Sequence, residues 1–169
     1  MEFSFETTYD QKALTAMAKG LRKTVRKKRS RRSHILGWII IFLATFLGLF
    51  SGPFDFRAAI TLLAALVMFV VLCFEDHING YFAGKRILPG TETSISYFTA
   101  DVFSSATKIG KSEFYYENIA ALAEANHYFI FLFSNNHAQV YDKRTLTGGC
   151  IDEFRGFIQD KTQKTIVAV

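Results

Sequence analysis

The chain has 169 residues, a formal net charge of +5, 50% hydrophobic residues and a mean hydropathy of +0.15. Its two prolines and eighteen phenylalanines exclude collagen-like and disordered chains, and its two cysteines are too few for a disulfide scaffold. These averages conceal three zones of different charge and hydropathy.

The N-terminal zone combines a short strand with a basic helix. Residues 1–8 alternate apolar and polar side chains, with Phe3, Phe5 and Thr7 on one face, which predicts a half-buried strand. In residues 9–34 apolar side chains recur every four positions from Ala13, which predicts an amphipathic helix. Ten Lys and Arg against three acids make this zone basic. We expect the helix to continue directly into the next zone.

Residues 35–74 read as a transmembrane helical hairpin, with spans at 35–51 and 57–74. The stretches 35–50 and 58–74 contain no charged residue, and each would extend about 24–26 Å as a helix, close to the ~30 Å hydrocarbon core. Ser51-Gly52-Pro53 predicts the turn between them. A buried helix pair in a soluble protein is disfavoured, because neither stretch has a polar face and the remaining chain is small.

Basic residues predict the orientation of this hairpin. Nine Lys and Arg precede the first span, Lys85 and Arg86 follow the second, and the connecting turn has only Arg57. The positive-inside rule therefore places both termini in the cytoplasm. The two cysteines then face a reducing compartment without forming a disulfide, and Cys150 is expected to be a small core residue.

The C-terminal zone predicts a β-rich domain. Residues 75–92 form a helical extension and linker ended by Pro89-Gly90, and residues 93–169 form the domain. Residues 128–134 are apolar on both faces, as in a central covered strand, and a turn at Asn135-Asn136 would place Phe131 opposite Val140. A helix is expected over residues 149–161. Strand-like runs occupy 93–98, 102–107, 112–116, 119–125, 128–134 and 137–142.

This order of elements resembles the YcxB-like family of two-span bacterial membrane proteins. The likeness is carried by Ile95-Ser96-Tyr97-Phe98, Tyr116-Glu117-Asn118-Ile119, Glu124, Tyr128-Phe129, Asp142-Lys143, Gly149 and Glu153-Phe154-Arg155. The resemblance implies an α+β protein of the bacterial inner membrane, whose cytoplasmic domain is similar to a pleckstrin-homology fold. Such a domain has about seven short antiparallel strands, here including the N-terminal one, capped by a C-terminal helix. The resemblance implies no activity, so it assigns no functional residue.

Catalytic and cofactor motifs are weak. Gly110-Lys111-Ser112 resembles the end of a phosphate-binding loop, but Ser105 stands where that motif needs glycine. The four histidines, at positions 34, 77, 127 and 137, have no metal-ligand spacing. We therefore expect no cofactor, no metal and no enzymatic activity.

The basic run is the feature whose physical role can be estimated. Each Lys or Arg near anionic headgroups contributes roughly 1 kcal/mol of attraction, which predicts a topology anchor that contacts anionic lipid. Nucleic acid is not expected as a partner, because few aromatic residues are interleaved with these charges. The residues concerned are Lys19, Arg22, Lys23, Arg26, Lys27, Lys28, Arg29, Arg31 and Arg32.

The function expected is a non-enzymatic, membrane-anchored interaction or regulatory module, with a protein partner or a second copy of the chain bound at edge strands or the terminal helix. One alternative is an accessory subunit of a transporter or other membrane complex, although Thr45, Ser51 and Thr61 are the polar residues available in the spans. Another is an interfacial enzyme acting on lipid headgroups. Its candidate residues are His34, Glu75, Asp76 and His77.

Overall fold

The first strand pairs with a strand far along the chain. In the computed structural model, which describes residues 2–50, 52, 54–134 and 136–169, β1 (Phe3–Thr8) lies antiparallel to β2 (Thr93–Phe98). β3 (Val102–Ala106) and β4 (Lys111–Tyr115) complete a four-stranded sheet in the order β1-β2-β3-β4. Phe3, Phe5 and Thr7 are each only 1% exposed, so the predicted half-buried strand is confirmed.

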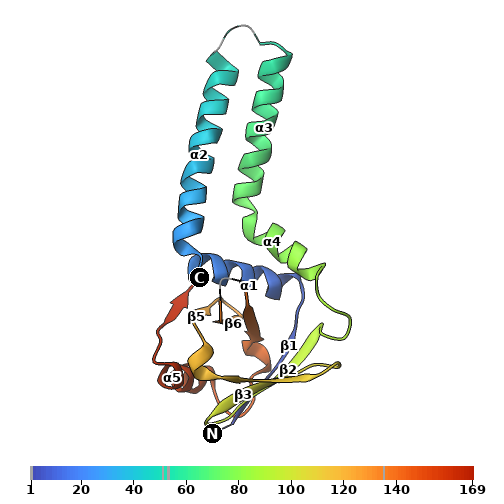
Figure 1. Cartoon of the computed structure of the whole chain (residues 1–169), viewed down its shortest axis with the longest axis vertical. Coiled ribbons are helices and arrows are strands. Elements are labelled where there is room, and N and C mark those ends of the chain that lie inside the picture. The colour runs from blue at the N-terminus through green and yellow to red at the C-terminus, as the bar shows by residue number, and fades with distance from the viewer. Residues whose placement is uncertain (1, 51, 53, 135) are drawn as a thin grey trace.

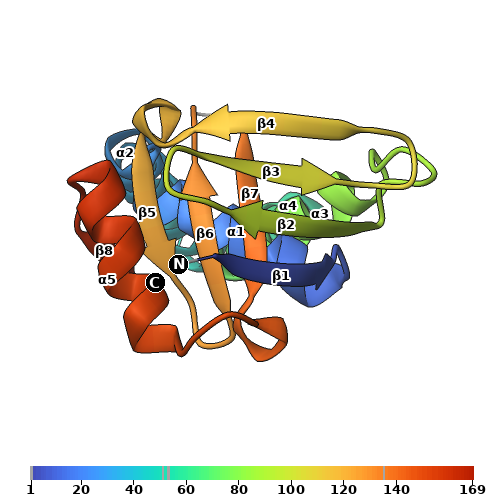
Figure 2. The ribbon, with the colours of Figure 1, turned by 90° about the horizontal axis from the view of Figure 1, so that it is seen from below.

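A second four-stranded sheet has the order β7-β6-β5-β8. It consists of β5 (Ala121–Glu124), β6 (Tyr128–Leu132), β7 (Ala138–Asp142) and β8 (Ile166–Ala168), with the 3-10 helices η1 (Tyr116–Asn118) and η2 (Lys143–Thr145) before β5 and after β7. The prediction of about seven antiparallel strands missed β8, which pairs parallel to β5. Helix α5 (Ile151–Thr162) brings the chain back beside β5 (Figure 2).

Phenylalanines from both sheets and α5 form the core. The Phe154 ring of α5 lies 4.7 Å from that of Phe5 and 5.0 Å from that of Phe98, both in edge-on geometry. Such aromatic pairs add about 0.5–1.5 kcal/mol beyond the area they bury. Cys150, expected in the core, is exposed and instead caps α5: its sulfur accepts from the Glu153 amide. The terminal helix therefore closes the domain through Phe154 and Ile158, which are fully buried.

Strand β6 is buried on both faces, as its two apolar faces predict. Phe129 and Phe131 point into the aromatic core, while Ile130 and Leu132 pack under helix α1 (Gln11–Lys23). The predicted register is wrong by one residue, because Val140 lies opposite Ile130 and not Phe131. The observed register puts Ile130 and Val140 together on the face that α1 covers. Of the predicted Asn135-Asn136 turn, Asn135 lies outside the described residues.

The basic segment does not form one continuous helix. Helix α1 begins after Asp10, whose carboxylate accepts from the Ala13 amide at 2.7 Å, and ends at Lys23. Helix α2 (Lys27–Phe50) begins after three intervening residues and rises away from the domain, whereas α1 lies across the second sheet (Figure 1). Since the apolar face of α1 is held on β6 and β7, the chain must bend at residues 24–26 to leave the sheet.

Helices α2 and α3 (Phe56–Cys73) form an antiparallel hairpin that projects from the domain (Figure 1). Both are long and apolar enough to cross a membrane, and nearly all their large apolar side chains are exposed. Asp55 starts α3 by accepting from the Ala58 amide at 2.9 Å. Ser51 and Pro53 of the predicted turn lie outside the described residues.

Helix α4 (Glu75–Gly84) turns away from α3 at Phe74 and packs along α1 (Figure 1). Gly80 permits this contact, because a Cβ at that position would lie 2.8 Å from the Thr15 amide nitrogen. Helix α1 thus lies between the second sheet and α4. The helix ends at Gly84, earlier than the Pro89-Gly90 turn that was expected to end it.

We predict that Phe5→Ala destabilises the domain by about 3–5 kcal/mol, because it removes a ring packed against Phe98, Tyr141 and Phe154. Limited proteolysis and thermal unfolding of the full chain in detergent would measure the loss. The matched control is Glu6→Ala, since Glu6 is the exposed neighbour on the same strand. Equal protease sensitivity of the two variants would show that β1 does not complete the core.

Candidate functional site

The nine basic residues predicted to contact headgroups are distributed over three elements. Helix α1 carries Lys19, Arg22 and Lys23, and Arg26 lies in the bend. The first turns of α2 carry the other five, all exposed: Lys27, Lys28, Arg29, Arg31 and Arg32. A cationic surface therefore lies at the foot of the hairpin. Contact with lipid remains a prediction.

An ion pair and a histidine–carboxylate contact tie α1 and α2 to α4. The Arg22 guanidinium donates to both Asp76 carboxylate oxygens, at 2.7 and 2.6 Å, and these bonds raise the pKa of Arg22. His34 Nε2 lies 2.5 Å from Glu75 Oε2. Three of the four residues considered for an interfacial enzyme are thus paired between helices. His77, the fourth, accepts a bond from the Gln11 side chain through its backbone carbonyl.

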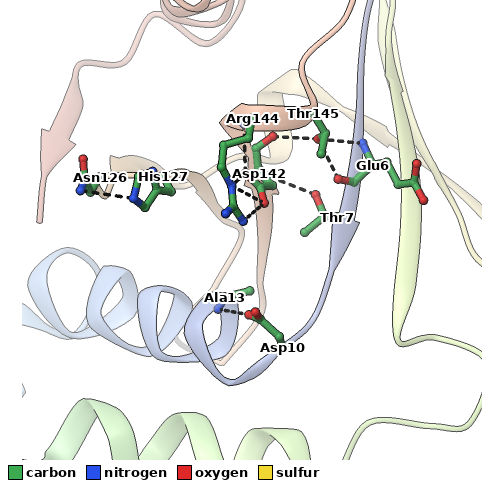
Figure 3. Close-up of polar contacts among 9 residues, drawn as sticks. All are labelled: Glu6, Thr7, Asp10, Ala13, Asn126, His127, Asp142, Arg144 and Thr145. Atoms are coloured by element: carbon green, nitrogen blue, oxygen red, sulfur yellow. Dashed lines mark hydrogen bonds and ion pairs between the residues drawn. The ribbon is translucent and has the colours of Figure 1, made fainter.

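A polar clasp joins β1 to the corner between β7 and η2 (Figure 3). The Asp142 amide donates to Thr7 Oγ1 at 3.1 Å, and Thr145 Oγ1 donates to the Glu6 carbonyl at 2.7 Å. The Arg144 side chain donates to the Asp142 carboxylate, and these bonds hold the pKa of Asp142 below its usual value. This clasp fastens the first sheet to the second, and of the residues in it Asp142 alone belongs to the motifs that carry the family resemblance.

The clasp continues into a close crossing of two chain segments. Gly148 has φ +90°, and a Cβ there would lie 2.0 Å from the Glu2 carbonyl oxygen. One residue earlier, Thr147 exchanges backbone hydrogen bonds with Ser4, each 3.0 Å long. Glycine is therefore required where the loop before α5 crosses the start of β1.

Three residues that carried the family resemblance meet in one cluster. Glu124 on β5 accepts from Lys143 Nζ at 2.5 Å and from Arg155 Nε and Nη2 at 3.0 and 2.8 Å. Burial alone would raise the pKa of Glu124, but the bonds from Arg155 and Lys143 outweigh it and lower that pKa. Lys143 also donates to the carbonyls of Ala125 and Asn126. The cluster joins β5, η2 and α5, which indicates a structural role.

A cavity of about 810 Å³ lies between α1, the segment after α4, the first sheet and β7. None of its lining residues is Asp or Glu, and hydroxyls, two cations and apolar side chains share its wall. Six or more separate chain segments contribute, so no local sequence motif could have indicated it. The lining residues are Tyr9, Leu14, Met17, Ala83, Arg86, Ile87, Leu88, Thr91, Ser94, Ser105, Thr107, Ile109, Gly110, Lys111, Ser112, His137, Ala138 and Gln139.

Metal chemistry has no candidate in the part of the chain that the structure describes, where no group of three or more His, Cys, Asp or Glu could hold an ion. Two other features are suited to binding a ligand: the cavity, whose lining residues include no Asp or Glu, and the cationic surface at the foot of the hairpin. Both favour a negatively charged ligand or surface.

Comparison with known proteins supports the resemblance stated above. Residues 98–158 match the family model described as YcxB-like protein, which confirms the resemblance over that stretch. The match runs from the end of β2 into α5 and includes Glu124, Lys143 and Arg155. No curated protein and no solved structure shows a significant match to the chain.

We predict that Glu124→Gln lowers the free energy of unfolding at pH 7 by about 1–3 kcal/mol, because Lys143 and Arg155 lose their shared carboxylate. The lowered pKa of Glu124 contributes stability that is fully present above the usual value of 4.5 and is lost as pH falls through the folded-state pKa. The difference from wild type should therefore narrow in acid, as measured by urea unfolding.

Glu113→Gln is the matched control, because the Glu113 side chain on β4 is exposed and pairs only with exposed Lys111 among the described residues. Its free energy of unfolding should equal that of the wild type at pH 7 and at pH 3. A Glu124→Gln variant whose deficit is the same at pH 7 and pH 3 would show that the charge of Glu124 does not stabilise the cluster.

Proposed function

We propose that this chain is a non-enzymatic interaction module anchored in the bacterial inner membrane, with α2 and α3 spanning the bilayer and both termini in the cytoplasm. The exposure of nearly every large apolar side chain on both helices supports this, because water would disfavour such a surface. The five exposed cations at the start of α2 support the orientation through the positive-inside rule and attraction to anionic headgroups.

Helix α4 suits a position in the headgroup layer. Its Tyr81 and Phe82 side chains are exposed, and the Lys85 ammonium lies 4.7 Å from the centroid of the Tyr81 ring. Aromatic residues with neighbouring cations favour the boundary between lipid and water. In this arrangement α4 and the cationic foot of α2 rest at the same depth, and the domain lies just beneath them.

The domain is proposed to be similar to a pleckstrin-homology fold. Support comes from the order of its elements: an antiparallel sheet of β1 to β4 in sequence order, then β5 to β7, then a helix packed against the core. Two features are additions to that plan, namely the hairpin inserted between β1 and β2 and the parallel strand β8. Fold likeness alone assigns no ligand.

The observation that carries the interaction role is the free edge of β4. Figure 2 shows β4 along the border of its sheet, and within the described residues no strand pairs with its outer side. Such an edge can accept an extended segment of another protein chain by adding a strand. Lys111 and Glu113 on β4 disfavour indiscriminate pairing, so a partner would need complementary charges.

The two alternatives have less support. An interfacial enzyme would need His34, Glu75 and Asp76 free to act, whereas Asp76 pairs with Arg22 and His34 contacts Glu75, so all three join helices to one another. An accessory subunit of a transporter agrees with the hairpin but not with a polar path along it, because Thr61 Oγ1 donates to the Arg57 carbonyl of its own helix. A role within a larger membrane complex is compatible with the interaction module.

We predict that a cysteine introduced at Phe54 is labelled from outside the cell, whereas cysteines at Glu2 or Lys164 are labelled only after permeabilisation. Phe54 lies at the tip of the hairpin, and the other two belong to the domain. Spheroplasts and a membrane-impermeant maleimide provide the measurement, on a background with Cys73→Ala and Cys150→Ser. Labelling of Glu2→Cys in intact spheroplasts would contradict the proposed topology.

We predict that a photo-crosslinking residue at Tyr115, on the β4 edge, yields one discrete adduct in native membranes. The same group at Asp160, on the exposed side of α5, serves as the control and should not yield that adduct. Mass spectrometry then distinguishes a different protein from a second copy of this chain. Identical adduct patterns at both positions, or none at Tyr115, would count against β4 as the interaction edge.

A further inference from the structure

The wall of the 810 Å³ cavity has the charge of an anion site. Arg86 follows α4 and Lys111 begins β4, and both cations line the cavity without any carboxylate beside them in its wall. Lys111 reaches exposed Glu113 at 3.4 Å, a surface pair that contributes little. The Arg86 side chain has no hydrogen bond or ion pair among the described residues. Both cations are therefore available to an anion in the cavity.

A buried hydroxyl in the same wall lacks a partner. Ser94 is 2% exposed, it is one of the residues that line the cavity, and its Oγ makes no hydrogen bond with any described residue. Burial raises the pKa of the Tyr9 hydroxyl, which lines the same cavity. An unsatisfied buried hydroxyl is costly, and a ligand that accepts its hydrogen bond would remove that cost.

Part of the remaining wall is apolar. Leu14 and Met17 of α1 form one side, and Ile87, Leu88 and Ile109 form another. Leu88 and Ile109 are 64% and 62% exposed, so apolar surface continues from the cavity to the outside. The cavity volume lies in the range of small-molecule sites. One ligand in this cavity therefore meets cations, hydroxyls and apolar side chains.

We propose that this cavity binds an anionic amphiphile, a phosphate-bearing head group with a short apolar chain. The phosphate contacts Arg86 and Lys111 and accepts from Ser94, while the chain lies along Leu14, Ile87 and Ile109. Arg and Lys are the usual partners of phosphate oxygens, and bonds to charged groups are the stronger ones. The cavity shares Lys111 and Ser112 with β4, but ligand binding and crosslinking at the β4 edge are measured separately, so either proposal can fail without the other.

The same chemistry could come from a membrane lipid or from a soluble phosphate ester, and the choice of probes separates the two. Full-length protein in uncharged detergent is titrated calorimetrically with dioctanoyl phosphatidic acid, with dioctanoyl phosphatidylcholine and with inorganic phosphate. We expect saturable one-to-one binding of the phosphatidic acid only. If inorganic phosphate binds with the same affinity, the cavity is an anion site and the proposal of an amphiphilic ligand is wrong. If dioctanoyl phosphatidylcholine, which has no net charge, binds with the same affinity, the proposal that the ligand must be an anion is wrong.

Variants test the assigned residues. Arg86→Gln with Lys111→Gln should weaken phosphatidic acid binding at least tenfold, and Ser94→Val about fivefold, as expected for losing bonds to a charged group. The matched control, Lys85→Gln with Lys108→Gln, removes the same charge from neighbouring positions outside the cavity lining and should bind like wild type. An equal loss in the control would show that binding follows overall charge.

Ser94→Val also separates a ligand contact from a packing defect. If Ser94 is only an unsatisfied core hydroxyl, the valine variant should melt at a higher temperature and bind phosphatidic acid unchanged, which would overturn its assignment. Weaker binding at equal or higher melting temperature supports it. The Arg86→Gln, Lys111→Gln variant changes only exposed side chains, so we expect it to fold normally. A loss of binding in this variant can therefore be assigned to the two cations.

Discussion

The rest of the structure depends on the pairing of β1 with β2. Phe3 lies opposite Phe98 and Thr8 opposite Thr93, so the chain leaves the sheet after its first strand and returns to the neighbouring position. Everything from α1 to α4 is therefore an insertion whose two ends are fixed beside each other. A helical insertion closed in this way must return to the side on which it started. In a bilayer, this pairing alone would require an even number of spans, independently of the distribution of basic residues.

The pairing also explains why the helices at the foot of the hairpin are packed and not flexible. Helix α1 supplies the second cover of β6, burying Ile130 and Leu132 on the face opposite the phenylalanine core. Helix α4 then packs on α1, where Gly80 meets Thr15 and Arg22 meets Asp76. Partly buried ion pairs of this kind fix orientation more than they add stability. The hairpin is thus joined to the domain through two stacked helices, and its direction relative to the sheets is set by side-chain contacts.

Patterns confined to one element could be predicted from the sequence, whereas relations between elements could not. The alternation around Phe3 and Phe5 and the two apolar faces of β6 each report their own burial, and both predictions are confirmed. The bend at residues 24–26 depends on the sheet beneath α1, so the helical periodicity of the basic segment gave no sign of it. The β6–β7 register depends on α1 covering Ile130 and Val140 together. Strand β8 has three residues, too few to show the alternation of apolar and polar side chains that predicts a strand. The cavity is assembled from separate segments, and its hydroxyls look like ordinary strand residues in the sequence.

The location of the cavity has a consequence for the hairpin. Its wall includes residues of α1, Ala83 of α4, the segment 86–88 that follows α4, and strands of both sheets. Since α4 follows α3 after a single residue, a change in the tilt of the hairpin relative to the domain would move one wall of the cavity against the others (Figure 1). A ligand that fits one arrangement better than another must then favour that arrangement by the same factor, because linkage between two equilibria is reciprocal. A tenfold preference corresponds to about 1.4 kcal/mol, comparable to one or two of the hydrogen bonds that now hold α4 on α1. If the hairpin tilts in this way, occupancy of the cavity and orientation of the hairpin are linked through the α1–α4 contact.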